Sequence, residues 1–324
     1  MFFLLTFSFV VYSQNEKDTA FISQFEKPNN IQLNTWVTDL DFSVNPRLQD
    51  RDFTVKFTPN VTGQTGFSFG LKKVTLFIGF QIPGTESDPW KYGKTKYLDF
   101  SFSYFNKKFG GEIYYRNYNG LYRDANDTTP LTIRDDARLT NYGGSFFYVF
   151  NYKKFSYRSA IGQLELQKKS AGSVVILANV NFRSLVADSS LIPKEIDSRQ
   201  NFSNLQGLTD LRFYTFNIRP GYAYNFVFKK GMYFISPSIF AGAGIGNFEY
   251  RGISGKVERG VNYDMDLRSI ISAGMNHKNW FINIFVIYDT SLNIFDNNLV
   301  SLQTTSYGLN IGYRLKSYFR IKWL

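Results

Sequence analysis

The sequence contains no cysteine and a single histidine, His277. Without cysteine the chain forms neither disulfide bonds nor a lipid-modified N-terminal cysteine. The shortage of both residues also argues against a transition-metal site, because thiolate and imidazole groups are the usual ligands of such ions. Long apolar runs are equally scarce, since no stretch of about 18 apolar residues follows the N-terminal region, and this excludes a helical membrane protein.

The one apolar run lies at the N-terminus, where residues 1–11 (MFFLLTFSFVV) have the character of a signal-peptide core. The small residue Ser13 allows cleavage after it, although the basic region that normally precedes such a core is missing. We expect residues 1–13 to be a signal peptide and residues 14–30 to be a periplasmic N-terminal segment. An N-terminal strand is the alternative interpretation.

What the sequence has in abundance is a period of two between large apolar residues and small or polar ones, as in Tyr307–Leu315. Such segments recur from residue 31 to residue 315 and are long enough to cross a bilayer. Lipid offers the backbone no hydrogen-bond partners, so strands cross it only as closed barrels, which carry aromatic girdles. Aromatic residues make up 19% of the chain. The sequence therefore predicts an all-β, transmembrane, antiparallel up-and-down β-barrel over 31–315 in the outer membrane of a Gram-negative bacterium, followed by a tail, 316–324.

The connections leave the strand number open within a range of about 12 to 14. Splitting segment 53–71 into two strands raises the count but places the long loops 81–96 and 119–137 on the periplasmic side, where turns are short. Keeping it whole gives an odd count, which bacterial barrels do not have. Either 155–186 contains a piece that does not span, which gives the lower count, or 187–209 hides a further strand.

The net charge is +11, and much of it lies in lysine pairs between the predicted strands. These pairs are Lys72-Lys73, Lys107-Lys108, Lys153-Lys154, Lys168-Lys169 and Lys229-Lys230. Nucleic-acid-binding proteins gather their basic residues on one surface, so we expect no nucleic-acid partner. Basic turns between lipid-crossing strands lie beside headgroup phosphates, which makes outer-membrane lipids, lipopolysaccharide among them, the expected partners.

The strand phase also assigns charged side chains to the inside of the barrel, because Arg or Lys facing lipid costs about 2–4 kcal/mol at mid-depth. The predicted lumen charge network consists of the acids Asp39, Asp41, Asp99, Glu112, Asp264 and Asp266 and the bases Lys56, Arg116, Arg158, Arg219, Arg268 and Arg314. Ion-selective pores are lined by an excess of one sign. Since this set is balanced, it predicts a lumen that is largely filled by paired charges.

Two features suggest chemistry but have simpler interpretations. A histidine is the usual general base of barrel hydrolases, but His277 lies in the tight turn Asn276–Asn279, where we expect no pocket. Gly242, Gly244 and Gly246 resemble a dinucleotide fingerprint, yet that motif requires a following helix, and none is predicted. We therefore expect no catalytic residue and no cofactor.

Three acidic groups are candidates for a divalent cation or for acid-base chemistry. Asp264 and Asp266 share one face of a strand with Arg268, and Asp39 and Asp41 share one face of another strand, so salt bridges to inward arginines are the simpler interpretation. The loop 119–137 carries Asp124, Asp127, Asp135 and Asp136 and is also typical of a solvated surface loop. We expect no bound metal.

Several segments together resemble a known family. They are Gly93–Tyr97, Lys108–Gly110, Phe150-Asn151, Phe155–Arg158, Gln167–Ser173, Asp188–Pro193 and Pro220–Tyr224. The chain is similar over about residues 30–315 to Bacteroidota outer-membrane proteins of domain of unknown function 4421. The resemblance implies an outer-membrane barrel, supplies no activity, and gives Gln167–Ser173 and Asp188–Pro193 a particular role. Lys168, Lys169 and Ser170 are candidates for contact with lipid headgroups or a partner protein.

Three functional hypotheses follow from these patterns. The leading one is a non-enzymatic outer-membrane barrel with a largely occluded, charge-balanced lumen that acts as a structural or accessory subunit of an envelope protein complex. The alternative is a passive pore or transporter for small solutes, anionic ones given the net charge of +11. A lipid-modifying or proteolytic barrel enzyme is the third, and it would depend on His277.

Overall fold

The computed structural model describes residues 18–45, 54–125, 130–193, 205, 207–252 and 255–316. The predicted signal peptide and residues 317–324 of the predicted tail lie outside these ranges. Within them the chain is almost entirely strand, with two short helices, α1 (Pro89–Tyr92) and α2 (Tyr157–Ala160), and a 3-10 turn, η2 (Lys229–Gly231). No helix in this part of the chain is both long enough and apolar enough to cross a membrane.

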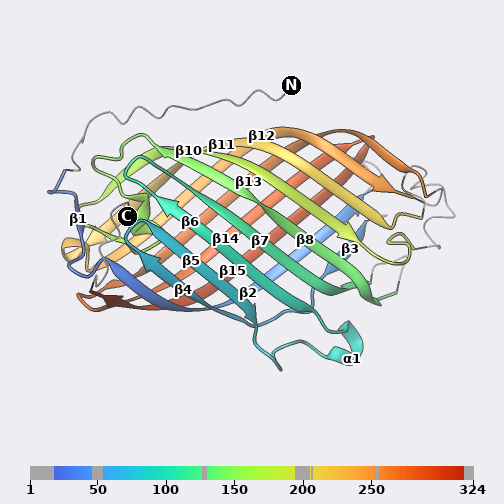
Figure 1. Ribbon diagram of the computed structural model, residues 1–324, viewed down its shortest axis with the longest axis horizontal. Coiled ribbons are helices and arrows are strands. Elements are labelled where there is room, and N and C mark those ends of the chain that lie inside the picture. The colour runs from blue at the N-terminus through green and yellow to red at the C-terminus, as the bar shows by residue number, and fades with distance from the viewer. Residues whose placement is uncertain are drawn as a thin grey trace, which may run out of the picture.

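Twelve strands form one closed antiparallel barrel (Figure 1). In order around the wall they are β2 (Asn29–Asn45), β4 (Gln64–Leu71), β5 (Val74–Gln81), β6 (Lys96–Phe105), β7 (Phe109–Arg123), β8 (Thr132–Val149), β10 (Ala171–Val186), β11 (Asp210–Phe228), β12 (Tyr233–Arg251), β13 (Val257–Asn276), β14 (Trp280–Phe295) and β15 (Asn298–Leu315). Strand β15 pairs with β2 over the whole length of β2 and closes the barrel without a free edge.

The barrel has the lower of the predicted strand numbers because residues 155–170 do not cross it. They contain α2 and the short strand β9 (Glu165–Gln167), which pairs with β1 (Ile22–Gln24) in a separate two-stranded sheet. The described part of 187–209 contains no strand. The prediction of an up-and-down barrel is confirmed. The strand number is twelve because, as one of the two alternatives proposed, segment 155–186 contains a piece that does not span the barrel.

One end of the barrel is narrower than the other because of a broken strand. Strand β3 (Val55–Thr58) and β4 run in the same direction along β2, separated by residues 59–63. Since β3 pairs with both β2 and β7, it takes the place of β4, β5 and β6 at that end. The described part of segment 53–71 is therefore one bent path with two paired pieces, β3 and β4, and the wall loses two strands from one end to the other.

The two ends of the barrel differ in their connections. Asn29 pairs with Leu315, so the first wall strand begins and the last wall strand ends at the same end of the barrel, which we call the terminal end. Its connections are mostly tight turns, such as 106–108 and 277–279. The opposite end, which we call the loop end, carries longer connections such as 187–209.

The middle of the outer wall is apolar and the corresponding inner wall is polar. Val180, Ile284 and Tyr263 are exposed on the outside, each by about three-fifths of its surface (61%, 60% and 60%). Residues in the alternate phase, such as Asn217 and Asn262, are completely buried. The period of two thus places large apolar groups outward over a continuous belt, as a barrel that spans a bilayer requires.

At the loop end the polarity of the two faces of the wall is reversed, with apolar residues inside and charged residues outside. Leu40 and Phe42 of β2 are buried in an apolar interior, while Asp41 between them lies on the outer side, as does the exposed Asp39 that precedes Leu40. Lys56 likewise alternates with the buried Val55 and Phe57 of β3. Asp39, Asp41 and Lys56, which the sequence placed in the lumen, therefore point outward, because the strands continue beyond the apolar belt and enclose an apolar core there.

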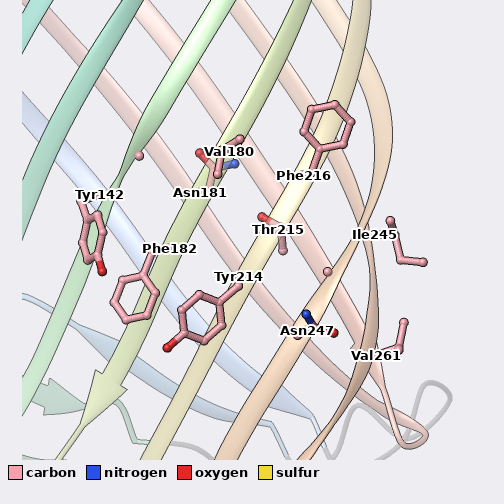
Figure 2. A pocket seen from close by; sticks show the side chains of 12 residues that line it. Tyr142, Val180, Asn181, Phe182, Tyr214, Thr215, Phe216, Ile245, Asn247 and Val261 are labelled. Carbon is pink, nitrogen blue, oxygen red and sulfur yellow. The ribbon is translucent and has the colours of Figure 1, made fainter. Parts of the chain in front are cut away.

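An apolar groove of about 610 Å³ lies on the outer wall across β8, β10, β11 and β12 (Figure 2). Tyr142, Phe182 and Tyr214 form a row along it, with ring centroids 4.4 Å and 4.8 Å apart. The four strands remain paired beneath the groove. The groove is therefore part of the aromatic outer surface and does not open into the interior.

Candidate functional site: the barrel interior

Three layers of side chains fill the inside of the barrel, and they follow one another along β11. Phe213 belongs to an apolar cluster at the loop end, Asn217 to a polar layer in the middle, and Ala223 to an apolar cluster at the terminal end. The polar layer comprises Asp99, Glu112, Arg116, Asn179, Arg183, Asn217, Arg219, Asp264, Asp266, Arg268, Asp289 and Ser291. It is the candidate functional site because it concentrates the buried charges of the wall.

Two carboxylates of β13 share one amide donor. The Nδ2 group of Asn217 on β11 donates to Oδ2 of Asp264 at 2.8 Å and also to Asp266. Ser291 of β14 donates to the other oxygen of Asp264 at 2.9 Å. Asn217 reaches these acids across β12 because its partner on that strand is Gly244, which in turn pairs with Asp264.

The glycine run of β12 has a steric explanation. A Cβ atom on Gly244 would lie 2.2 Å from the carbonyl oxygen of Phe216, and one on Gly242 would lie 2.1 Å from that of Ile218 and 2.6 Å from Cγ of Arg219. The run therefore makes room for the long polar side chains of β11 that cross over it, consistent with the role of strand glycines at close approaches.

Ion pairs link five further charges of the polar layer. Arg219 and Arg268 both approach Asp289, at 3.8 Å and 3.5 Å. Arg116 pairs with Asp99 at 2.9 Å, and the Tyr97 hydroxyl donates to the same carboxylate at 3.0 Å. Pairing of this kind compensates the cost of burying charge.

The structure adds two residues to the predicted charge network. Arg183 donates to the Ser291 hydroxyl at 3.1 Å, and Asp289 receives both arginine contacts of that side. Both residues follow the inward phase of their strands, Arg183 in line with Asn179 and Asp289 in line with Asn283. The period of two therefore contained the signal for both.

At the terminal end, residues 150–170 fold into the barrel, and we call this segment the plug. The sequence predicted a strand here, but Arg158 lies in α2 and pairs with Glu165 at 2.9 Å. The Ser156 hydroxyl donates to Glu165 at 2.6 Å, and all three side chains are nearly completely buried. The amide of Asn225 on β11 donates to the Ser156 carbonyl at 3.1 Å, which fastens the plug to the wall.

Arg314, another predicted member of the network, has a different environment. It lies near the terminal end, 1% exposed, with its guanidinium 3.6 Å from the ring centroid of Phe25 and 4.5 Å from that of Phe281. It donates to the carbonyl of Trp280 at 3.0 Å and to Oδ1 of Asn276 at 2.8 Å. Arg314 thus holds the chain that precedes β2 against β14 and β15.

Several charges on the outside of the loop end are paired. Lys56 contacts Asp41 at 2.9 Å and Asp124 at 3.5 Å. Burial alone would lower the pKa of Lys56, but the hydrogen bond and charge of Asp41, with Asp124, raise that pKa above its usual range. Asp136 pairs with Arg134 at 2.8 Å, while Asp127 lies outside the described residues. No group of three metal-ligating side chains occurs within the described ranges.

His277 remains in the exposed turn that the sequence predicted. Its ring stacks on Trp280 with centroids 5.3 Å apart, and its Nδ1 atom accepts a long hydrogen bond of 3.5 Å from the Asn279 backbone. The turn lies at the terminal end, away from the polar layer, so the structure brings His277 together with none of the buried carboxylates.

Comparison with protein families assigns the chain by its sequence. The family described as Domain of unknown function (DUF4421) matches residues 16–315. The chain belongs to this family. No curated protein matches the chain significantly. The family resemblance of the sequence is thereby confirmed.

Several solved outer-membrane proteins are similar to this chain at low identity. The outer membrane protease OmpT of Escherichia coli is 6% identical, with 89% of this chain and 96% of that chain covered and a TM-score of 0.39. The β domain of the Bordetella autotransporter BrkA is 10% identical, with coverages of 89% and 99% and a TM-score of 0.39. The toluene transporter TodX of P. putida is 9% identical, with 90% of this chain and 91% of that chain covered and a TM-score of 0.32.

Two segments that carried the family resemblance hold connections in place. In Gln167–Ser173, the Gln167 amide donates to the carbonyls of Lys154 and Lys169 at 2.6 Å and 2.9 Å, and the Ser170 hydroxyl accepts from the Val227 backbone at 3.0 Å. In Asp188–Pro193, Ser189 donates to Asp136 at 2.9 Å. Their observed contacts are thus structural.

Proposed function

We propose that this protein is a non-enzymatic barrel of the outer membrane of a Gram-negative bacterium, with a largely occluded lumen, and that it acts as a structural or accessory subunit of an envelope complex. The observation that carries the proposal is the plug. Its side chains Phe155, Tyr157 and Leu164 pack into the terminal-end cluster with Phe147 and Phe240 of the wall. Apolar packing of this density leaves little room for a continuous file of water.

The loop end supports the same proposal. Leu191, Ile192, Leu205 and Leu208 of the connection 187–209 are buried among wall residues of the loop-end cluster. The polar layer therefore lies between two apolar layers. Hydrophobic constrictions block ions and water by dewetting, so either layer alone would oppose conduction.

A non-enzymatic role is supported by the way the buried acids are used. Asp264 and Asp266 accept from Asn217, Asp99 pairs with Arg116, and Glu165 pairs with Arg158 within the plug. A catalytic carboxylate or base must instead reach a substrate. In the described interior these charged groups therefore form contacts that cross-link the wall and the plug.

Occlusion is tested by conductance. We expect the full-length protein, folded and inserted into a planar bilayer, to give no steady single-channel current under conditions in which a general porin conducts. Insertion is verified on the same sample by the shift in gel mobility between unheated and heated protein. A steady current from the inserted wild-type chain would overturn the occluded lumen and favour a passive pore, with anion over cation selectivity measured from the reversal potential.

The role as a subunit is tested by purification from native membranes in mild detergent, followed by mass spectrometry. We expect a stoichiometric set of other envelope proteins to accompany the barrel. An unrelated outer-membrane barrel with the same tag, expressed at the same level, serves as the control for adventitious capture. Recovery of the barrel alone would count against a subunit role and leave its fold and placement untouched.

A further inference from the structure

Every described connection at the terminal end of the barrel carries lysine. The residues are Lys27 before β2, Lys72 and Lys73 between β4 and β5, Lys107 and Lys108 between β6 and β7, Lys153, Lys154, Lys168 and Lys169 in the plug segment, Lys229 and Lys230 between β11 and β12, Lys278 between β13 and β14, and Lys316 after β15. We call this set the lysine rim. The sequence showed the pairs, and the structure places all of them at one end.

The lysine rim has few acidic partners. Lys278 pairs with Glu26 at 3.1 Å, and the other carboxylates of this end within the described ranges are Asp18 and the buried Glu165. At the loop end, by contrast, basic side chains pair locally, as Arg212 does with Asp210 at 2.7 Å. The rim is thus a surface of uncompensated positive charge.

Aromatic residues support several of these lysines from the membrane side. The ammonium of Lys229 lies 5.6 Å from the ring centroid of Tyr233, and that of Lys27 lies 5.9 Å from that of Tyr313. Phe228 and Trp280, beside the turns, are exposed on the outer wall. Aromatic side chains at this position mark the boundary between acyl chains and headgroups. Flexible lysine side chains just beyond it reach the headgroup phosphates.

We propose that the lysine rim binds the phosphates of anionic glycerophospholipids in the membrane leaflet at the terminal end. An acidic protein would dock on one side or over the mouth, whereas a leaflet surrounds the barrel. Lysines occur in each described connection around the circumference, so the surface matches a surrounding partner. The inference rests on the proposed placement in a membrane, but it does not depend on an occluded lumen or on a complex.

The test uses Trp280, which lies at the rim, as a fluorescent reporter. Trp90 and Trp323 are replaced by phenylalanine, which leaves Trp280 and the interior Trp36. The folded full chain is placed in phosphatidylcholine vesicles that contain either brominated phosphatidylglycerol or brominated phosphatidylcholine at the same mole fraction. We expect the relative association constant to favour phosphatidylglycerol by about fivefold at low salt, because a single lysine near an anionic surface contributes a factor of about this size. The preference should be smaller at high salt, which screens the charges.

Matched variants locate the effect. The triple variant Lys229→Gln, Lys230→Gln, Lys316→Gln should lose most of the preference, whereas Lys91→Gln, Lys94→Gln, Lys96→Gln, with the same charge change away from the terminal end, should retain it. Equal quenching by the two lipids, or an equal loss in both variants, would overturn the rim proposal alone. Quenching by neither lipid would overturn the membrane placement as well.

Discussion

At the residue scale, the hydrogen bonds of the barrel interior depend on glycine residues as much as on the polar side chains that form them. Gly244 of β12 lies between Asn217 and Asp264, and the amide crosses above it to reach the acid. A methyl group there would meet backbone atoms of Phe216, which are unable to rotate away. The hydrogen bonds between β11 and β13 therefore require glycine at this position.

We predict that Gly244→Ala lowers the free energy of unfolding of the barrel by about 1–3 kcal/mol, the usual cost of overpacking. Urea titration of the folded barrel in detergent, followed by gel mobility, measures the change. Gly144→Ala on β8 is the matched control, because a Cβ there would meet its nearest atom at an ordinary 3.6 Å. A loss of stability equal in the two variants would contradict the steric account.

At the element scale, the sequence predicted the wall well. The period of two located the spanning strands, because each of them has one face toward lipid and one toward a polar interior. It also predicted inward positions for Asp99, Arg116, Arg219, Asp264 and Asp266, and these residues lie together in the polar layer. The even number and short turns of barrels then limited the strand count, which the structure settles at twelve.

Other elements could not be predicted from the same pattern. The plug contains alternating apolar residues, but they pack inside the barrel and not against lipid, so Arg158 lies in a helical turn and not on a strand. At the loop end the alternation is intact while its meaning is reversed, because the apolar phase of β2 from Leu40 to Val44 faces an enclosed core. Periodicity reports two faces, but it does not tell which face is in contact with lipid.

At the scale of the whole molecule, the wall has two zones of opposite polarity. The belt exposes residues such as Ile284 to the outside, whereas beyond it, toward the loop end, Asp39 is outside and Leu40 inside. Barrels place short turns on the periplasmic side and longer loops outside the cell. The loop-end zone should therefore project from the membrane into the external medium, and the lysine rim should face the periplasm.

The absence of cysteine allows a direct test of this arrangement with single-cysteine variants on intact cells. We predict that a membrane-impermeant maleimide labels Asp39→Cys, because that side chain is exposed outside the belt, and does not label Leu40→Cys, which is 4% exposed in the adjacent position. Ile284→Cys should stay unlabelled in the lipid belt, and Lys230→Cys should react only after the outer membrane is permeabilised. Labelling of Leu40→Cys in place of Asp39→Cys would restore the lumen assignment of the sequence, and labelling of Lys230→Cys on intact cells would invert the orientation. The four positions differ in whether they face outward or inward and in where they lie along the barrel axis. Their labelling pattern therefore distinguishes an error in the assignment of inner and outer faces from an inverted orientation of the barrel in the membrane.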